Sequence, residues 1–382
     1  SSRVTGLFPQ VRCLPKSHTS NCTEFGMAAN FGGNQPNYEL CTTQSGIRGL
    51  CMRRAECTRS SGVASGFCGT YGVCCETNLA CNAVSRLKRT VIRNPIPLPS
   101  RCSYHFQPYS PNVCQLRIDF DMILAPPLIP DGVNNVEAPT CVTDIFQVGD
   151  LRLCGTNTNQ HIYVPFEVIQ GTGDVTIQFT LANRIQNPTV AAIWNMVVTQ
   201  LECPPTVNQQ NPNQNQNSLR YLKSFLKNPN NDFQLLAPNG CLQYFTEPTG
   251  TFDSFNYNNA QGPYPGNLRY SICFRRAAGD TGVLSATTFS MAVAENAVNN
   301  VDFDCHSTID TPGRPNDYLL IPESVLAATA TSPPMFATYY CGTSLQTADL
   351  LLAPNGPFVI YFNSDNLYAT TERGFRIAYT IQ

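Results

Sequence analysis

The chain has 382 residues and a formal net charge of −2, with 13% charged and 42% hydrophobic residues. A balance so close to neutral offers no broad electrostatic attraction, so neither nucleic acid nor an anionic membrane is expected as a partner. No apolar run approaches the roughly 18 residues that a membrane-spanning helix needs, so no membrane span is expected.

The 18 cysteines are the strongest compositional signal. Paired cysteines at this density persist in oxidising compartments, which predicts a secreted, extracellular protein. The chain starts with Ser1-Ser2-Arg3, so an export signal is expected to have been removed. The length suits two or three domains.

Residues 1–80 are rich in cysteine and glycine and show no periodic apolar pattern. A segment this small buries too little surface to fold unaided, so disulfides are expected to replace a core. Cys74 and Cys75 are adjacent, and neighbouring residues on a strand point to opposite faces. Their sulfurs should therefore reach different partners.

Cys13 and Cys22 stand apart from the other cysteines and most simply pair with each other. Asn21 opens the glycosylation sequon Asn21-Cys22-Thr23, although a cysteine in the middle position disfavours the modification.

Three cysteine-bearing stretches follow, namely CTTQSGIRGLC at 41–51, RRAEC at 53–57 and FCGTYGVCC at 67–75. Together they resemble the clip modules of arthropod secreted proteins. The resemblance implies the pairs Cys41–Cys74, Cys51–Cys68 and Cys57–Cys75. Clip modules usually precede serine protease domains and act as docking elements, so the resemblance also implies a docking role.

Residues 81–204 change to a period of two. Leu116, Ile118 and Phe120 share one face, with Arg117 and Asp119 on the other, and similar stripes run through 162–168 and 175–181. This alternation, without a long helical stretch, predicts half-buried antiparallel strands of a β-sandwich.

The stretches at 94–95, 101–104, 141–148 and 153–155 resemble the opening and the second cysteine pair of a CUB domain. Residues 113–120 and 154–161 are similar to a family of arthropod secreted CUB proteins that also carry a clip-like N-terminus. The resemblance implies the pairs Cys81–Cys102 and Cys141–Cys154.

Cys114 and Cys203 are then left over, and the pair Cys114–Cys203 follows by elimination. Each has the parity of inward-facing neighbours on its strand, so both should point inward. The alternative joins Cys102 to Cys114 and Cys81 to Cys203.

Residues 205–238 are predicted to be a linker, because the run NQQNPNQNQNS at 208–218 is too polar to bury a core. Leu219, Leu222, Phe225 and Leu226 then recur at helical spacing. The favoured interpretation is a short helix at a domain junction, and the alternative is a basic segment lying on a membrane surface.

Residues 239–382 show alternating stripes at 270–274, 358–362 and 375–381, typical of a second sandwich. The stretches 317–321, 340–342, 364–365 and 374–375 fall in CUB order, a fuller resemblance than that of the first module. It implies the pairs Cys241–Cys273 and Cys305–Cys341. The predicted fold is all-β: two CUB-like antiparallel β-sandwiches preceded by a small disulfide-rich, clip-like module.

Many CUB domains bind calcium through a Glu and two Asp, and no other cofactor is implied. In the second module Asp317 and Asp365 match two of these positions. The expected Glu is not in place, so the third ligand is sought among the carboxylates Glu295, Asp302 and Asp304. In the first module Asp144 matches one position, but Ala125-Pro126 fall where the Glu is expected, so calcium is not expected there.

No catalytic motif stands out, because the four histidines are scattered and no HExxH, nucleophile elbow or P-loop occurs. The resemblance implies a non-catalytic secreted adaptor that binds extracellular proteins, with the surface around Asp317 and Asp365 contacting a partner lysine.

Three alternatives remain open, the last of which is an enzyme with an unrecognised site. The first is carbohydrate or microbial-pattern recognition in arthropod immunity through exposed aromatic rings, with Tyr104, Tyr109, Tyr257 and Tyr264 as candidates. The second is a cofactor of a haemolymph protease cascade that docks a clip-domain protease. Residues 86–89 form a basic loop in the favoured interpretation, or a dibasic processing site.

Overall fold

The computed structural model describes most of the chain from residue 39 onward. The described residues are 39–382 apart from 45, 60–61, 71, 131–136, 168–172, 185–190, 205–231, 293–299, 307–316, 347, 355, 357, 369 and 371. The predicted pair Cys13–Cys22, the sequon at Asn21 and the predicted helix around 219–226 lie outside these residues. Among the described residues, no helix has the length and apolarity needed to cross a membrane.

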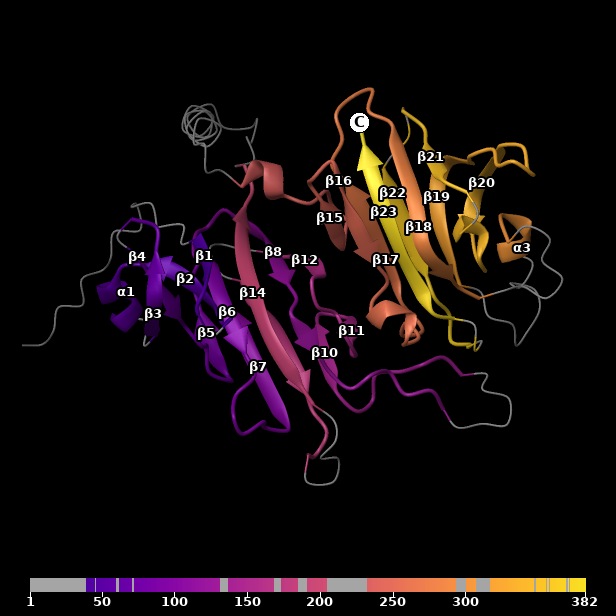
Figure 1. Ribbon diagram of the computed structural model, residues 1–382. Coiled ribbons are helices and arrows are strands. Elements are labelled where there is room, and N and C mark those ends of the chain that lie inside the picture. Colours follow the sequence, from indigo (N-terminus) through magenta and orange to yellow (C-terminus); the bar gives the residue numbers. More distant parts are fainter. Residues whose placement is uncertain are drawn as a thin grey trace, which may run out of the picture. The chain divides into compact units, whose positions relative to one another are not determined.

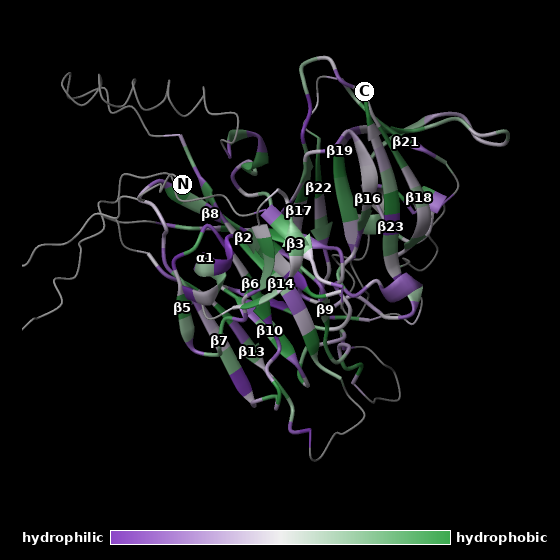
Figure 2. Cartoon of the chain, turned by 60° about the vertical axis from the view of Figure 1, so that its left-hand side comes forward, coloured by the Kyte–Doolittle hydropathy of each residue, from purple (hydrophilic) through white to green (hydrophobic). Residues whose placement is uncertain are grey.

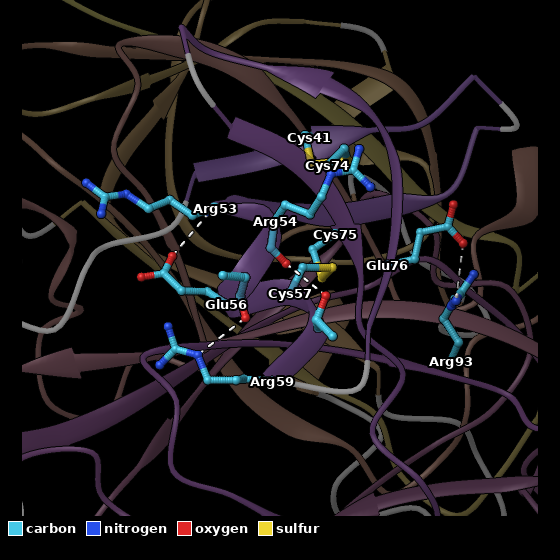
Figure 3. Close-up of a disulfide and its surroundings, with 12 residues drawn as sticks. Cys41, Arg53, Arg54, Glu56, Cys57, Arg59, Cys74, Cys75, Glu76 and Arg93 are labelled. Atoms are coloured by element: carbon cyan, nitrogen blue, oxygen red, sulfur yellow. Dashed lines mark hydrogen bonds and ion pairs between the residues drawn. A yellow bond between two sulfur atoms is a disulfide. The ribbon is translucent and has the colours of Figure 1, made fainter. Parts of the chain in front are cut away.

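The first structured element is a small antiparallel sheet (Figure 1). Its order is β1 (Glu39–Thr42), β2 (Arg48–Met52), β4 (Gly72–Glu76) and β3 (Val63–Cys68), with α1 (Arg54–Arg59) beside it. Cys74 and Cys75 on β4 bond to Cys41 and Cys57, two different partners (Figure 3). The few apolar side chains of this sheet pack onto Val91 and Val197 of the next module.

The described residues of the next module form ten strands arranged in two sheets. They are β5 (Ala83–Ser85), β6 (Arg89–Arg93), β7 (Arg101–Phe106), β8 (Val113–Asp119), β9 (Met122–Ile123), β10 (Ile145–Val148), β11 (Leu151–Leu153), β12 (His161–Pro165), β13 (Val175–Thr180) and β14 (Ile193–Glu202). One sheet has the order β11-β10-β13-β7-β5, and the other has the order β12-β8-β14-β6 with β9 beside β14. On β8 Leu116 and Ile118 are buried while Arg117 lies on the opposite face, as the alternating pattern predicted.

In the C-terminal module, the part of the chain that the structure describes forms another nine strands. They are β15 (Gln243–Phe245), β16 (Thr249–Asp253), β17 (Arg269–Phe274), β18 (Gly282–Ser290), β19 (Tyr318–Leu326), β20 (Met335–Tyr340), β21 (Leu350–Leu352), β22 (Val359–Asn363) and β23 (Gly374–Ile381). Short helical turns are η1 (Phe233–Leu235), η2 (Asn258–Ala260), α3 (Phe303–His306) and η3 (Ser344–Gln346). Figure 2 shows hydrophobic and hydrophilic residues mixed along individual strands, and the buried members form the core. The prediction of an all-β fold is confirmed.

The two larger modules repeat the same strand pairing. β5 pairs parallel with β7 as β15 does with β17, and β13 joins β7 to β10 as β22 joins β17 to β19. β14 lies between β6 and β8 as β23 lies between β16 and β18. The equivalence lets single residues of the two modules be compared, although β21 also pairs with β19 and joins the second module into one continuous sheet.

Eight disulfides occur among the described residues. They are Cys41–Cys74, Cys51–Cys68, Cys57–Cys75, Cys81–Cys102, Cys114–Cys203, Cys141–Cys154, Cys241–Cys273 and Cys305–Cys341. The alternative pairing of Cys102 with Cys114 is therefore absent from the structure. Cys114 and Cys203 are partly exposed. The pairing of β14 with β8 passes from Leu201–Gln115 to Glu202–Val113, so it skips Cys114, and the parity expected for this residue does not hold.

Residues 37–382 form one compact unit, in which the two larger modules contact each other directly. The Thr156 amide donates to Asn256 Oδ1, and the Asn256 amide donates to Asn157 Oδ1, both at 3.0 Å. His161 is buried against Tyr244, with its Nε2 2.9 Å from the carbonyl oxygen of that residue. The segments 1–80, 81–204, 205–238 and 239–382 stay predictions as domain boundaries.

The basic stretch at 86–89 is held in place by contacts. Arg86 donates two hydrogen bonds to Gln107 Oε1, Lys88 forms a 2.8 Å ion pair with Asp232, and Arg89 begins β6.

Candidate functional site

The second module brings Asp317 and Asp365 together at one end of its strands. Asp317 directly precedes β19, Asp365 follows β22 by two residues, and Tyr318 pairs with Asn363 between these strands. The backbone amide of Asp365 donates to Asp317 Oδ1 at 2.7 Å. Strand pairing therefore positions the two carboxylates that the sequence singled out.

Tyr264 is buried and contacts Asp317. Its hydroxyl donates to Asp317 Oδ2 at 2.7 Å, and its ring packs edge-on against Phe362 with centroids 5.3 Å apart. Burial raises the pKa of the Tyr264 hydroxyl far above its ordinary value, and the charges of Asp317 and Glu372 raise it further. Glu372, two residues before β23, is itself fully buried.

Asp317 is only 2% exposed. Burial raises the pKa of its carboxyl group well above the ordinary value, and the neighbouring charge of Asp365 acts in the same direction, while the hydrogen bond from Tyr264 opposes it. In the described part of the chain, no lysine, arginine or histidine lies within ion-pair distance of Asp317. Asp317 itself therefore has no basic side chain as a counter-charge among those residues.

The other carboxylates considered as ligands make different contacts. Asp304 Oδ2 accepts the Asn300 amide at 2.9 Å, and Asp302 Oδ1 accepts the amides of Thr338 and Tyr339. Glu295 lies outside the described residues. Within 39–382, with the gaps stated above, no three His, Cys, Asp or Glu side chains form a group able to hold a metal ion. The calcium ligand set of Asp317, Asp365 and Asp304 remains a prediction.

The equivalent carboxylate of the first module has different neighbours. Asp144 is fully buried directly before β10, and its Oδ2 lies 2.7 Å from Arg184 Nη2. The amides of Ala125 and Ala182 donate to the same carboxylate at 3.0 and 3.1 Å. Sequence reasoning identified Asp144 but missed Arg184, for which the only signal is a basic residue shortly after a strand.

The tyrosines considered for glycan recognition do not form an exposed surface. Tyr104, Tyr257 and Tyr264 are 0%, 5% and 1% exposed, and their hydroxyls donate to Arg93 O, Thr288 Oγ1 and Asp317 Oδ2. The expectation was wrong for these three residues, because their rings fill the interior while their hydroxyls have internal partners. Tyr109 is partly exposed, with Lys88 Nζ 5.9 Å from its ring centroid.

Comparison with known proteins identifies one domain. Residues 238–382 match the model of the animal CUB domain, so the second module is a CUB domain. No curated protein matches.

Three solved structures illustrate the structural matches. The CUB1-EGF-CUB2 domain of human MASP-1/3 is 15% identical, covers 78% of this chain and 100% of its own, and gives a TM-score of 0.21. The CUB1-EGF-CUB2 domains of rat MASP-1 are 14% identical, cover 78% of this chain and 99% of their own, and give a TM-score of 0.20. The MASP-1 CUB2 domain bound to Ca²⁺ is 20% identical, covers 36% of this chain and 96% of its own, and gives a TM-score of 0.19. TM-scores this low carry no argument about function.

Proposed function

We propose that the chain is a non-catalytic, secreted adaptor that uses the loop end of its second module to hold a partner protein. CUB domains typically take part in protein–protein interactions, and the match over residues 238–382 supports this role. The observation that carries the proposal is the buried Asp317 carboxylate, which lies beside Asp365 and itself has no basic side chain within ion-pair distance among the described residues. Buried negative charge is stabilised when a positive charge approaches it, so this surface suits a basic side chain of a partner.

The positive charge of a calcium ion is complementary to the carboxylates of Asp317 and Asp365. Calcium takes roughly six to eight oxygen ligands, several of them from carboxylates. Asp317 and Asp365 would supply the first of these ligands, and the charge of Glu372 acts on the same Tyr264 hydroxyl. The ion would neutralise the carboxylates and fix the loop that follows β22, while other oxygens, for which Glu295 and Asp304 are predicted, would complete the shell.

Replacement of Asp365 by asparagine tests this role. The amide side chain of the Asp365→Asn variant would retain an oxygen to accept the Leu367 amide, which donates to Asp365 Oδ1 at 2.7 Å, so the loop should keep its fold. A partner isolated with the native chain should bind this variant at least tenfold more weakly in calcium, because one buried charge pair contributes on the order of 1.5 kcal/mol or more. Surface plasmon resonance with the purified partner measures the difference.

Glu247→Gln is the matched control, because Glu247 is an exposed carboxylate of the same module in the turn between β15 and β16. It should bind the partner as the unaltered chain does. Equal affinities for the unaltered chain, Glu247→Gln and Asp365→Asn would show that the partner binds elsewhere.

The narrower alternatives stay predictions. An arthropod haemolymph protein that docks clip-domain proteases would use the disulfide-rich sheet, where Arg53, Arg54 and Arg59 are exposed around α1 (Figure 3). Recognition of glycans would need a surface other than the buried tyrosines.

A further inference from the structure

The same hydrogen-bonded position exists in both larger modules. Ile145 pairs with Thr180 as Tyr318 pairs with Asn363, so Asp144 corresponds to Asp317 and Ala182 corresponds to Asp365. The Ala182 amide donates to Asp144 at 3.1 Å, just as the Asp365 amide donates to Asp317 at 2.7 Å. The same backbone framework thus surrounds a buried aspartate in each module.

The charges around the two aspartates differ. In the second module the position two residues after β22 adds another carboxylate, Asp365, and Leu367 follows two residues later. In the first module the corresponding positions hold the neutral Ala182 and then Arg184, whose guanidinium lies 2.7 Å from Asp144 Oδ2. One carboxylate and one cation therefore replace a pair of carboxylates.

We propose that Arg184 is a built-in cation that fixes the loop end of the first module without a bound metal ion. A guanidinium next to a fully buried carboxylate supplies the compensating charge that such a group requires. Asp144 then ties together three segments, because it also accepts the amides of Ala125 and Ala182. Arg184 and Asp144 belong to the first module alone, so their role holds whether or not the second module binds calcium.

Functionally, the two loop ends should respond differently to their surroundings. The first keeps its shape in the presence of a chelator, so a ligand held there is bound independently of calcium. Calcium dependence of the whole protein, where it exists, would arise outside this loop end.

Trp194 provides a readout of the first module alone. It is the only tryptophan of the chain, and it is fully buried on β14. Its ring stacks on Phe179 with centroids 4.0 Å apart, and its indole N–H donates to the Tyr104 hydroxyl at 3.2 Å. Its fluorescence should therefore change when this module unfolds.

The experiment compares thermal unfolding of full-length variants through Trp194 fluorescence, each in calcium and in EDTA. Arg184→Leu should lower the first-module melting temperature by roughly 10 °C, because it leaves a buried carboxylate without its cation. Asp144→Asn combined with Arg184→Leu should recover at least half of the loss, since a neutral amide needs no counter-charge. Arg152→Leu, at an exposed position of β11, should melt like the unaltered chain.

Three results would overturn the proposal. The first is an Arg184→Leu variant that melts as the unaltered chain does. The second is a double variant that melts no higher than Arg184→Leu or fails to fold. The third is a chain carrying Asp365→Asn whose Trp194 transition still shifts between calcium and EDTA. Should Arg184→Leu itself not fold, the double variant and the comparison between calcium and EDTA still decide.

Discussion

Acidification from pH 6.5 to pH 4 should lower the free energy of unfolding by about 3 kcal/mol through His161 alone. Desolvation, followed by the nearby charge of Arg117, lowers the pKa of this imidazole from 6.5 to about 4. The side chain packs between Tyr163 and Phe245 and lies 2.9 Å from the carbonyl oxygen of Tyr244. The native contact between the two modules is therefore built for a neutral imidazole.

The direction of the effect follows from proton uptake. Between pH 6.5 and pH 4 the unfolded chain binds a proton at His161 and the folded chain does not, so falling pH favours unfolding. The contribution of the neutral His161 side chain to the free energy of unfolding is fully present above pH 6.5 and is lost as the pH falls to about 4. Urea unfolding followed by Trp194 fluorescence at pH 7 and pH 4 measures it.

The variant His161→Gln should be less sensitive to pH by that amount, because glutamine does not titrate. His105→Gln serves as its control, since His105 is a partly exposed histidine on β7 of the same module. Identical pH dependence in the unaltered chain and in His161→Gln would refute the assignment.

Loss of the Cys57–Cys75 disulfide should unfold the disulfide-rich sheet while leaving the two larger modules intact. The bond closes a loop with a sequence separation of 18 residues, for which the chain-entropy model gives a stabilisation of about 3 kcal/mol. Apart from the disulfides Cys41–Cys74 and Cys51–Cys68, little else holds the sheet, because its core consists of a few side chains such as Leu50, Met52 and Val73. So small a core does not offset a loss of this size.

Trypsin cleavage followed by mass spectrometry tests whether the disulfide-rich sheet unfolds without Cys57–Cys75. The variant with Cys57→Ala and Cys75→Ala should be cut much faster after the arginines around α1 (Figure 3), with an unchanged Trp194 signal. Removal of Cys141–Cys154, which lies in the first large module, should leave these cleavage rates unchanged. Equal rates in all three proteins would mean that the sheet does not depend on this disulfide.

The period-two patterns made the strands predictable, because a half-buried strand imposes alternation on its own sequence. Leu116 and Ile118 on β8 and Ile377 and Tyr379 on β23 are buried as the stripes predicted. The parity expected for Cys114 fails, because the pairing of β8 with β14 skips this residue, and such a bulge changes parity without altering residue types.

The candidate site was only partly predictable. Asp317 and Asp365 stand out because each lies beside a strand in a recognisable order. Tyr264 was expected on the surface, but it is buried with its hydroxyl on Asp317, a contact 53 residues away along the chain. Glu372 and Arg184 were missed for the same reason, since their neighbours are set by tertiary pairing and not by local spacing.

Cation binding by Asp317 and Asp365 of the second module is tested most directly by calcium addition at pH 8. Calorimetric unfolding in calcium and in EDTA, with Trp194 fluorescence recorded in parallel to identify the first module, separates the two transitions. Calcium should raise the melting temperature of the second module in the unaltered chain and should do so far less in Asp365→Asn. Equal transitions with and without calcium in the unaltered chain would contradict it.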